Sequence, residues 1–206
     1  MKFGDYDTGT DWGLFCSGIE ITGPEVQRYQ VEVPGRHGKL DLTNTLFDEP
    51  KFYNRTGTFT FDAPAHAPQE WHDLMSDIRG KLHGQTVQII LDEDSDWYYT
   101  GLLEVSADED AGEITITADM EPFKQAVEET VVTVSSSGAI SLANDRMTVI
   151  PTVVTTGETM IVIGTSSLSM SAGTYYLSNY PLYEGTTTWT ITTSSAVTIT
   201  YRQGRL

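Results

Sequence analysis

The sequence predicts a mainly β protein that contains one helix and is divided into two parts. Most apolar residues alternate with polar ones in short runs, as in half-buried strands. Only the stretch 68–83 carries apolar residues at helical spacing over several turns. After residues 121–124, nearly every polar strand position is Ser or Thr. We therefore expect a first part, 1–125, with a curved antiparallel sheet and the helix, and a second part, 126–206, that is a small β-sandwich.

The predicted helix extends from Pro68 to His83. Pro68 suits the first turn, where its missing N–H is no loss, and Gly84 suits the left-handed position after the last turn. Gly80 lies inside the helix and weakens it by about 1 kcal/mol relative to alanine. Five apolar residues share one helical face and should pack against strands: Trp71, Leu74, Met75, Ile78 and Leu82.

Strands are predicted on both sides of this helix. The residues up to Phe15 are expected to form a strand with a mobile start. The segment 34–38 is expected to be a loop, because proline removes a ladder donor and glycine permits positive φ. The acidic turn 108–112 should join the last two strands of the first part. The alternating segments are 19–21, 29–33, 40–42, 56–61, 87–91, 97–105 and 113–120.

The second part shows strand signals and no helix signal. Glycines and short polar runs separate the strands, and the run 135–138 is expected to be a turn. At about 80 residues the part is small for a sandwich, so we expect it to rest on the first part or on a neighbour. The predicted strands are 131–134, 147–154, 159–163, 168–170, 174–177, 187–192 and 196–201.

The charge of the chain is strongly negative and unevenly distributed. The formal net charge is −17. Residues 1–125 hold 24 acidic and 9 basic side chains, a net charge of −15, and residues 126–206 hold 5 and 3, a net charge of −2. This balance argues against a simple nucleic-acid binder, whose phosphate contacts need Lys and Arg. The acid excess indicates either a need for solubility or a surface that must not retain DNA.

Further limits come from the apolar runs and the single cysteine. No apolar run approaches the roughly 20 residues that cross a bilayer, so we expect no membrane insertion. Residues 1–5 lack the basic start and apolar run of a secretory signal. Cys16 alone cannot form an internal disulfide. We therefore expect synthesis in a reducing cytoplasm, which is compatible with later release in a particle.

Candidate catalytic and metal-ligating residues are few. Cys16 with a histidine is a possible nucleophile–base pair, although a small buried thiol is the default for a lone cysteine. The run Asp92–Asp96 offers oxygen ligands for calcium, but it lacks the glycine and closing glutamate of the EF-hand loop. The turn Asp108–Asp110 could supply half of an acid–base pair, or be a hairpin turn alone. The histidines are His37, His66, His72 and His83. These patterns predict no enzyme, no cofactor and no metal site.

Two aromatic residues are candidates for a sugar-binding site. Trp189 and Tyr201 could stack on a sugar ring, or they could be core residues of the sandwich. The first alternative makes the chain a carbohydrate-binding adhesion module that contacts a host surface.

The order of several short motifs resembles the distal tail proteins of long-tailed bacteriophages and prophages of Gram-positive bacteria. The stretch 31–43, VEVPGRHGKLDLT, is similar to the opening of that family, and Tyr53-Asn54-Arg55 matches its following aromatic segment. The helix with Trp71 and the closing Leu82-His83-Gly84 match as well. The later matches are Ile89–Asp94 with Trp97–Gly101, then Glu121–Lys124, and finally the Thr-rich strands from Gly185 to Leu206. The resemblance covers nearly the whole chain.

The resemblance implies a structural role in a virion. It implies that six copies form a ring at the distal end of the tail tube, which is the hub for baseplate or tip assembly. It implies a tail-tube-like first part with the helix against a β-sandwich or split barrel, and a galectin-like sandwich outside the ring. The implied partners are the tail tube protein, the tail-tip or tail-associated lysin hub protein, and tape measure and baseplate proteins. The genome would pass through the ring without specific binding.

The loop of the opening motif is the candidate contact between subunits or with the tube. Its residues are Pro34, Gly35, Arg36, His37, Gly38 and Lys39. Arg36 can form a bidentate bond to a carboxylate of a neighbour. An internal hairpin turn remains the alternative for this loop. Part of the acid excess of the first part is expected to line the lumen of the ring, where it would repel DNA phosphates.

Overall fold

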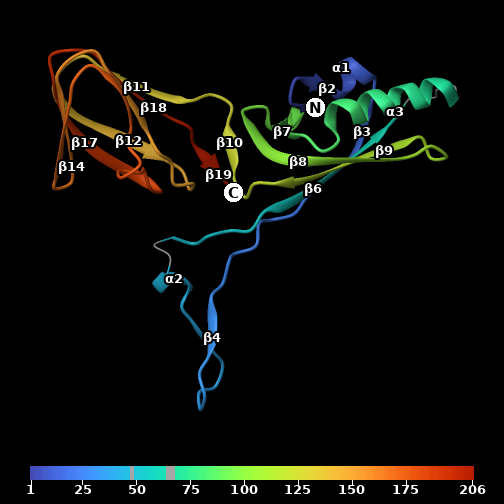
Figure 1. Ribbon diagram of the computed structural model, residues 1–206, viewed down its shortest axis with the longest axis horizontal. Coiled ribbons are helices and arrows are strands. Elements are labelled where there is room, and N and C mark those ends of the chain that lie inside the picture. The colour runs from blue at the N-terminus through green and yellow to red at the C-terminus, as the bar shows by residue number, and fades with distance from the viewer. Residues whose placement is uncertain (47–48, 64–67) are drawn as a thin grey trace. The chain divides into compact units, whose positions relative to one another are not determined.

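The chain folds into two units, each with its own hydrophobic core. A computed structural model describes residues 1–46, 49–63 and 68–206 of the chain (Figure 1). Unit 1 is Met1–Pro122 and unit 2 is Phe123–Leu206. This boundary falls three residues before the expected start of the second part. Strands predominate in both units, so the predicted mainly β class with one main helix is confirmed.

Unit 1 is built on an antiparallel sheet of seven strands in the order β2-β1-β7-β8-β9-β6-β3. The long hairpin of β8 and β9 pairs Gly101 with Met120 at one end and Asp108 with Glu113 at the other. β6 pairs with β9 from Arg55–Met120 to Asp62–Glu113. The strands are β1 (Lys2–Phe3), β2 (Tyr6–Asp7), β3 (Phe15–Ile21), β6 (Arg55–Asp62), β7 (Thr86–Ile90), β8 (Trp97–Asp108) and β9 (Glu113–Met120).

The main helix, α3 (Pro68–Leu82), packs on this sheet and contacts β8. The five residues of its apolar face belong to the core of unit 1: Trp71, Met75, Ile78 and Leu82 are buried, and Leu74 is partly buried against them. They meet the inward side chains of the strands, including Phe59, Phe61, Leu103, Ile114 and Ile116. The helix ends one residue before the expected end, and Gly84 follows with φ +74°. The C-terminal end of α3 is therefore followed by the left-handed glycine that the sequence indicates.

The N-terminal segment differs from the expected single strand with a mobile start. It forms β1 and β2, then a short helix, α1 (Thr8–Trp12), and then β3. The Asp7 side chain accepts hydrogen bonds from the amides of Gly9 and Thr10, and Gly13 ends the helix with φ +65°. A helix of five residues is too short to show a period, so only these capping residues could have indicated it.

Unit 2 is a sandwich of two antiparallel four-stranded sheets, β11-β18-β13-β16 and β12-β17-β14-β15. A short pair, β10 (Lys124–Ala126) with β19 (Gly204–Arg205), lies next to them in the chain. The first sheet contains β11 (Thr130–Val134), β13 (Thr152–Thr155), β16 (Gly173–Tyr176) and β18 (Val197–Tyr201). The second contains β12 (Gly138–Asn144), β14 (Thr159–Ile163), β15 (Ser166–Met170) and β17 (Gly185–Thr193).

Two expectations for unit 2 were wrong in detail. No strand was predicted between residues 134 and 147, yet β12 pairs with β17 over its full length. Small residues such as Ala139 and Ala143 carry little strand propensity, so pairing with β17 determines this strand rather than its own composition. The predicted strand 147–154 begins only at Thr152, because Pro151 precedes it and interrupts the run.

Candidate functional site

The segment between β3 and β6, residues 22–54, contains a small sheet of its own. We call this segment the arm. Its strands β4 (Gln30–Glu32) and β5 (Lys39–Asp41) pair with each other, and the short helix α2 (Thr43–Leu46) follows β5. Closer to the main sheet, the Gln27 amide donates to the Lys51 carbonyl at 2.8 Å, and the Tyr53 amide donates to the Glu25 carbonyl at 2.8 Å. The two limbs are thus held together along much of their length (Figure 1).

A buried threonine fixes the turn after β5. The Tyr29 amide donates to Thr43 Oγ1 at 2.8 Å, and the Thr43 amide donates to Asp41 Oδ1 at 2.9 Å. Hydrogen bonds from Thr43 hold the pKa of the Asp41 carboxyl below its ordinary value. Residues 47–48 lie outside the described residues. The arm therefore has defined local geometry although it adds little to the core of unit 1.

The arm exposes several apolar side chains. Val26, Tyr29, Val31, Val33 and Tyr53 are 38–55% exposed. Contiguous exposed apolar residues in a soluble protein commonly mark an interaction surface. The alternating pattern predicted strands here, but it did not reveal that these side chains are exposed.

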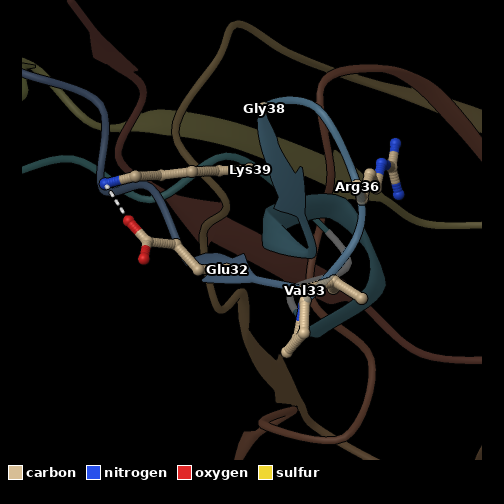
Figure 2. A pocket seen from close by; sticks show the side chains of 6 residues that line it. Glu32, Val33, Arg36, Gly38 and Lys39 are labelled. Atoms are coloured by element: carbon tan, nitrogen blue, oxygen red, sulfur yellow. Dashed lines mark ion pairs between the residues drawn. The ribbon is translucent and has the colours of Figure 1, made fainter.

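The tip of the arm contains the loop singled out from the sequence. Gly35 and Gly38 have φ of +83° and +77°, and the Arg36 amide donates to the Val33 carbonyl at 3.1 Å. The loop is therefore a hairpin turn, whatever it contacts in an assembly. Lys39 Nζ lies 3.7 Å from Glu32 Oε1 beside an open hollow of about 580 Å³. Figure 2 shows the Arg36 side chain pointing away from this ion pair. Its guanidinium is thus free to meet a group outside the loop.

The outer strand β3 offers a second surface for contacts. It is the last strand of the unit 1 sheet, and among the described residues it pairs with β6 on one side only. Phe15 is 79% exposed and Ile19 is 42% exposed. An open edge of this kind presents backbone N–H and C=O groups that can pair with another chain. A shift in register between Cys16 and Gly18 interrupts its pairing with β6.

Cys16 lies on this edge, and within the described residues it does not form the catalytic pair considered from the sequence. The thiol is exposed, so the expectation of a small buried thiol is wrong. Its hydrogen bond goes to the Gly18 carbonyl at 3.7 Å, and partial burial raises the pKa of the thiol. His37 lies at the arm tip, His72 lies on α3 and His83 follows that helix, while His66 lies outside the described residues. A thiol with a raised pKa that contacts none of the described histidines is poorly suited to nucleophilic catalysis.

The candidate metal ligands do not form a site in the described part of the chain. Asp92–Asp94 forms a single 3₁₀ turn, and Asp108 caps its own hairpin turn by accepting from the amides of Asp110 and Ala111. Among residues 1–46, 49–63 and 68–206, no group of three or more His, Cys, Asp or Glu side chains could hold a metal ion. Within the same ranges, no helix has the length and apolar composition that a membrane crossing requires.

The two aromatic residues considered for sugar binding are core residues of unit 2. Trp189 is 1% exposed and Tyr201 is 4% exposed, and both belong to the core cluster of the sandwich. Tyr201 Oη donates to the Ala143 carbonyl at 2.6 Å. Trp189 and Tyr201 are therefore core residues of the sandwich, and neither ring presents a free face to a sugar.

These features define a class of protein: a two-unit, mainly β chain whose first unit carries a capped helix, an open sheet edge and an apolar arm. The solved structure of the Dit protein (gp19.1) of phage SPP1, described as a paradigm of the hub adsorption apparatus in phages that infect Gram-positive bacteria, has this fold. The similarity has a TM-score of 0.72 at 13% sequence identity, and it covers 99% of this chain and 98% of that chain. No family model matches the sequence, and no curated protein is significantly similar to it. The likeness shows a shared fold across both units.

Proposed function

We propose that the chain is a structural component of a phage tail that forms a hexameric ring at the distal end of the tail tube. In this role it is the hub on which the baseplate or tip is assembled, and it acts without catalysis. The observation that carries the proposal is the likeness to SPP1 Dit, which spans both units rather than one common domain. The tail tube protein, the tail-tip or tail-associated lysin hub protein and the tape measure and baseplate proteins are the proposed partners.

The surfaces of unit 1 support assembly from identical copies. The open edge at β3 and the apolar arm are different surfaces, so contact between them on successive copies is heterologous. Heterologous contacts produce a closed ring when the rotation between copies closes. The loop Pro34–Lys39, with Arg36 unpaired within its own loop, is the proposed contact at the end of the arm.

The charge supports passage of DNA through such a ring. The first 125 residues carry a net charge of −15, from 24 acidic and 9 basic side chains. A lumen that displays part of this excess would repel phosphates and let the genome slide without binding. A ring structure with a neutral or basic lumen would contradict this element of the proposal.

The test of the proposed function is the assembled particle. Light scattering of the purified full chain is expected to give the mass of six copies at high concentration. Negative-stain images should show six-fold rings with a central hole. A chain that stays monomeric at high concentration would overturn the proposed function.

A second candidate function is adhesion to a host polysaccharide. Unit 2 has an open hollow of about 420 Å³ lined mainly by hydroxyl side chains, including those of Thr159, Ser169, Thr192 and Ser194. Hydroxyl groups can exchange hydrogen bonds with sugars. Binding of the full chain to a glycan array, lost when Thr192 and Ser194 are replaced by valine and alanine, would favour this candidate.

A further inference from the structure

Arg55 is a buried cation whose side chain is largely unpaired. It begins β6 and is 6% exposed. Within the described part of the chain, its Nε and Nη2 have no hydrogen-bond partner. A guanidinium keeps its charge in proteins, although burial lowers the pKa of Arg55 from its ordinary value. Buried charges normally have an opposite charge or several hydrogen bonds, so this arrangement calls for an explanation.

Among the described residues, Tyr99 interacts with the Arg55 guanidinium through its ring and its side-chain oxygen, and no carboxylate pairs with it. The guanidinium carbon lies 5.5 Å from the centre of the Tyr99 ring. Opposite Arg55 on β9 is Met120, and the next residue on the same face of β6 is Gly57. A Cβ at Gly57 would lie 2.7 Å from Met120 Cε, so this part of the core is tightly filled. The cation–π contact compensates part of the cost of burying this charge. Hydrogen bonds to a carboxylate would compensate the rest.

The side chain of Arg55 is buried within one copy, but the residue lies close to the open side of β6. It lies where the second limb of the arm enters the sheet, two residues after the half-exposed Tyr53. β3 pairs with β6 only from Asp62 to Gly57, so Arg55 lies two residues beyond the paired part on the open side of β6. Hydrogen bonds between Thr22 and Thr56 join the two limbs at this root of the arm.

We propose that Arg55 is the receptor for a carboxylate side chain of a second copy of this chain, which binds at the root of the arm when copies assemble. The proposal rests on the ring inferred above. A second copy is the occupant that the charge favours, because its first 125 residues carry 24 carboxylates and 9 basic groups. The planar fork of the guanidinium matches a carboxylate through two parallel hydrogen bonds. A charge that is unpaired in one copy would then become paired only in the assembly.

The test compares Arg55→Met with the matched control Arg79→Met, which removes the same charge from an exposed position on α3. For each full-length variant we would measure the melting temperature in dilute solution and the concentration at which light scattering detects assembly. Removing an unpaired buried charge should leave the melting temperature of the dilute R55M protein unchanged or raise it. Its assembly should require at least about tenfold more protein, because the interface loses a charged pair. R79M should match the wild type in both measurements.

The outcomes separate this proposal from the proposed function. If the wild-type chain never assembles, both the proposed ring and the proposed role of Arg55 are overturned. If R55M assembles as readily as the wild type, the proposed ring is retained and the proposed role of Arg55 is overturned. If R55M does not fold, a side-chain-resolution image of the wild-type ring decides. It should show a carboxylate oxygen of the neighbouring copy within about 4 Å of the Arg55 guanidinium. A guanidinium that faces only its own chain there overturns the proposal.

Discussion

The indole Nε1 of Trp12 donates a 2.8 Å hydrogen bond to Oδ2 of Asp77, and this bond joins the short helix α1 to α3 across 65 positions of sequence. Lys81 Nζ binds the same oxygen at 2.8 Å and lies 4.9 Å from the centre of the Tyr6 ring. Tyr6 in turn stacks on Trp12 with ring centres 5.6 Å apart. The N-terminal segment is thus held on the main helix by one carboxylate that serves two donors.

Replacement of Asp77 should weaken this junction in two separable steps. Asp77→Ala removes both hydrogen bonds and should lower the free energy of unfolding by about 0.5–1 kcal/mol, since the carboxylate is half-exposed. Asp77→Asn keeps an oxygen for Trp12 and should lose less. Urea denaturation measures the difference, and Asp73→Asn on the exposed side of α3 is the control. Equal stability of D77A and the wild type would show that this junction contributes nothing.

The same carboxylate should make the free energy of unfolding depend on pH. Hydrogen bonds from Lys81, and then from Trp12, hold the pKa of Asp77 below its ordinary value of 3.8. A carboxyl whose pKa is lower in the folded state stabilises fully above its unfolded pKa and loses that contribution as pH falls through the folded value. The stability advantage of the wild type over D77N should therefore be present at pH 7 and shrink below about pH 4. An advantage that stays constant down to pH 2 would contradict this assignment.

The centre of the helix face should be the most sensitive part of α3. Ile78 is completely buried, whereas Arg79 beside it is exposed. Ile78→Ala removes buried methyl groups and leaves a cavity, so it should cost about 2–5 kcal/mol of unfolding free energy. Arg79→Ala should change the stability by less than about 0.5 kcal/mol. Denaturation of both variants in urea is the measurement. A small loss for I78A would mean that the helix does not pack as described.

The arm tip should affect assembly rather than folding. Arg36→Ala removes the guanidinium that points out of the loop (Figure 2). Because no residue of this loop belongs to the core of unit 1, the melting temperature of the variant in dilute solution should equal that of the wild type. If the loop is a contact, light scattering should show weaker assembly than for the wild type and for the control Arg79→Ala. An undiminished hexamer would indicate that the loop is a turn alone.

The single cysteine reports on the open edge of the sheet. Cys16 lies exposed on β3, so a thiol reagent should modify the folded monomer, slowly at neutral pH because its pKa is raised. If β3 pairs with a neighbouring copy, assembly should protect the thiol by an order of magnitude or more in rate. Reaction of the ring and of the dilute monomer with the same reagent gives the comparison. Equal rates would place β3 outside the interface.

The predicted helix and most strands follow from local period, but several elements do not. The short helix α1 spans barely more than one turn, and β12 is rich in small residues, so neither shows a clear pattern. Both depend on distant partners, α1 on Asp77 and β12 on β17. The burial of Cys16 was predicted wrongly because residue type gives only a tendency, while its strand lies at the edge of the sheet. The family resemblance from ordered motifs agrees in fold with the likeness to SPP1 Dit.

The sequence by itself determined the mainly β class, the apolar face of the helix and the acid excess of the first part. These are properties of spacing and composition, which each segment carries alone. Only the tertiary structure decided that the arm residues are exposed, that Trp189 is buried and that Arg55 is a buried cation with unpaired nitrogens. Burial depends on which strands pair across long sequence separations, and alternation along one strand does not specify what lies against either of its faces.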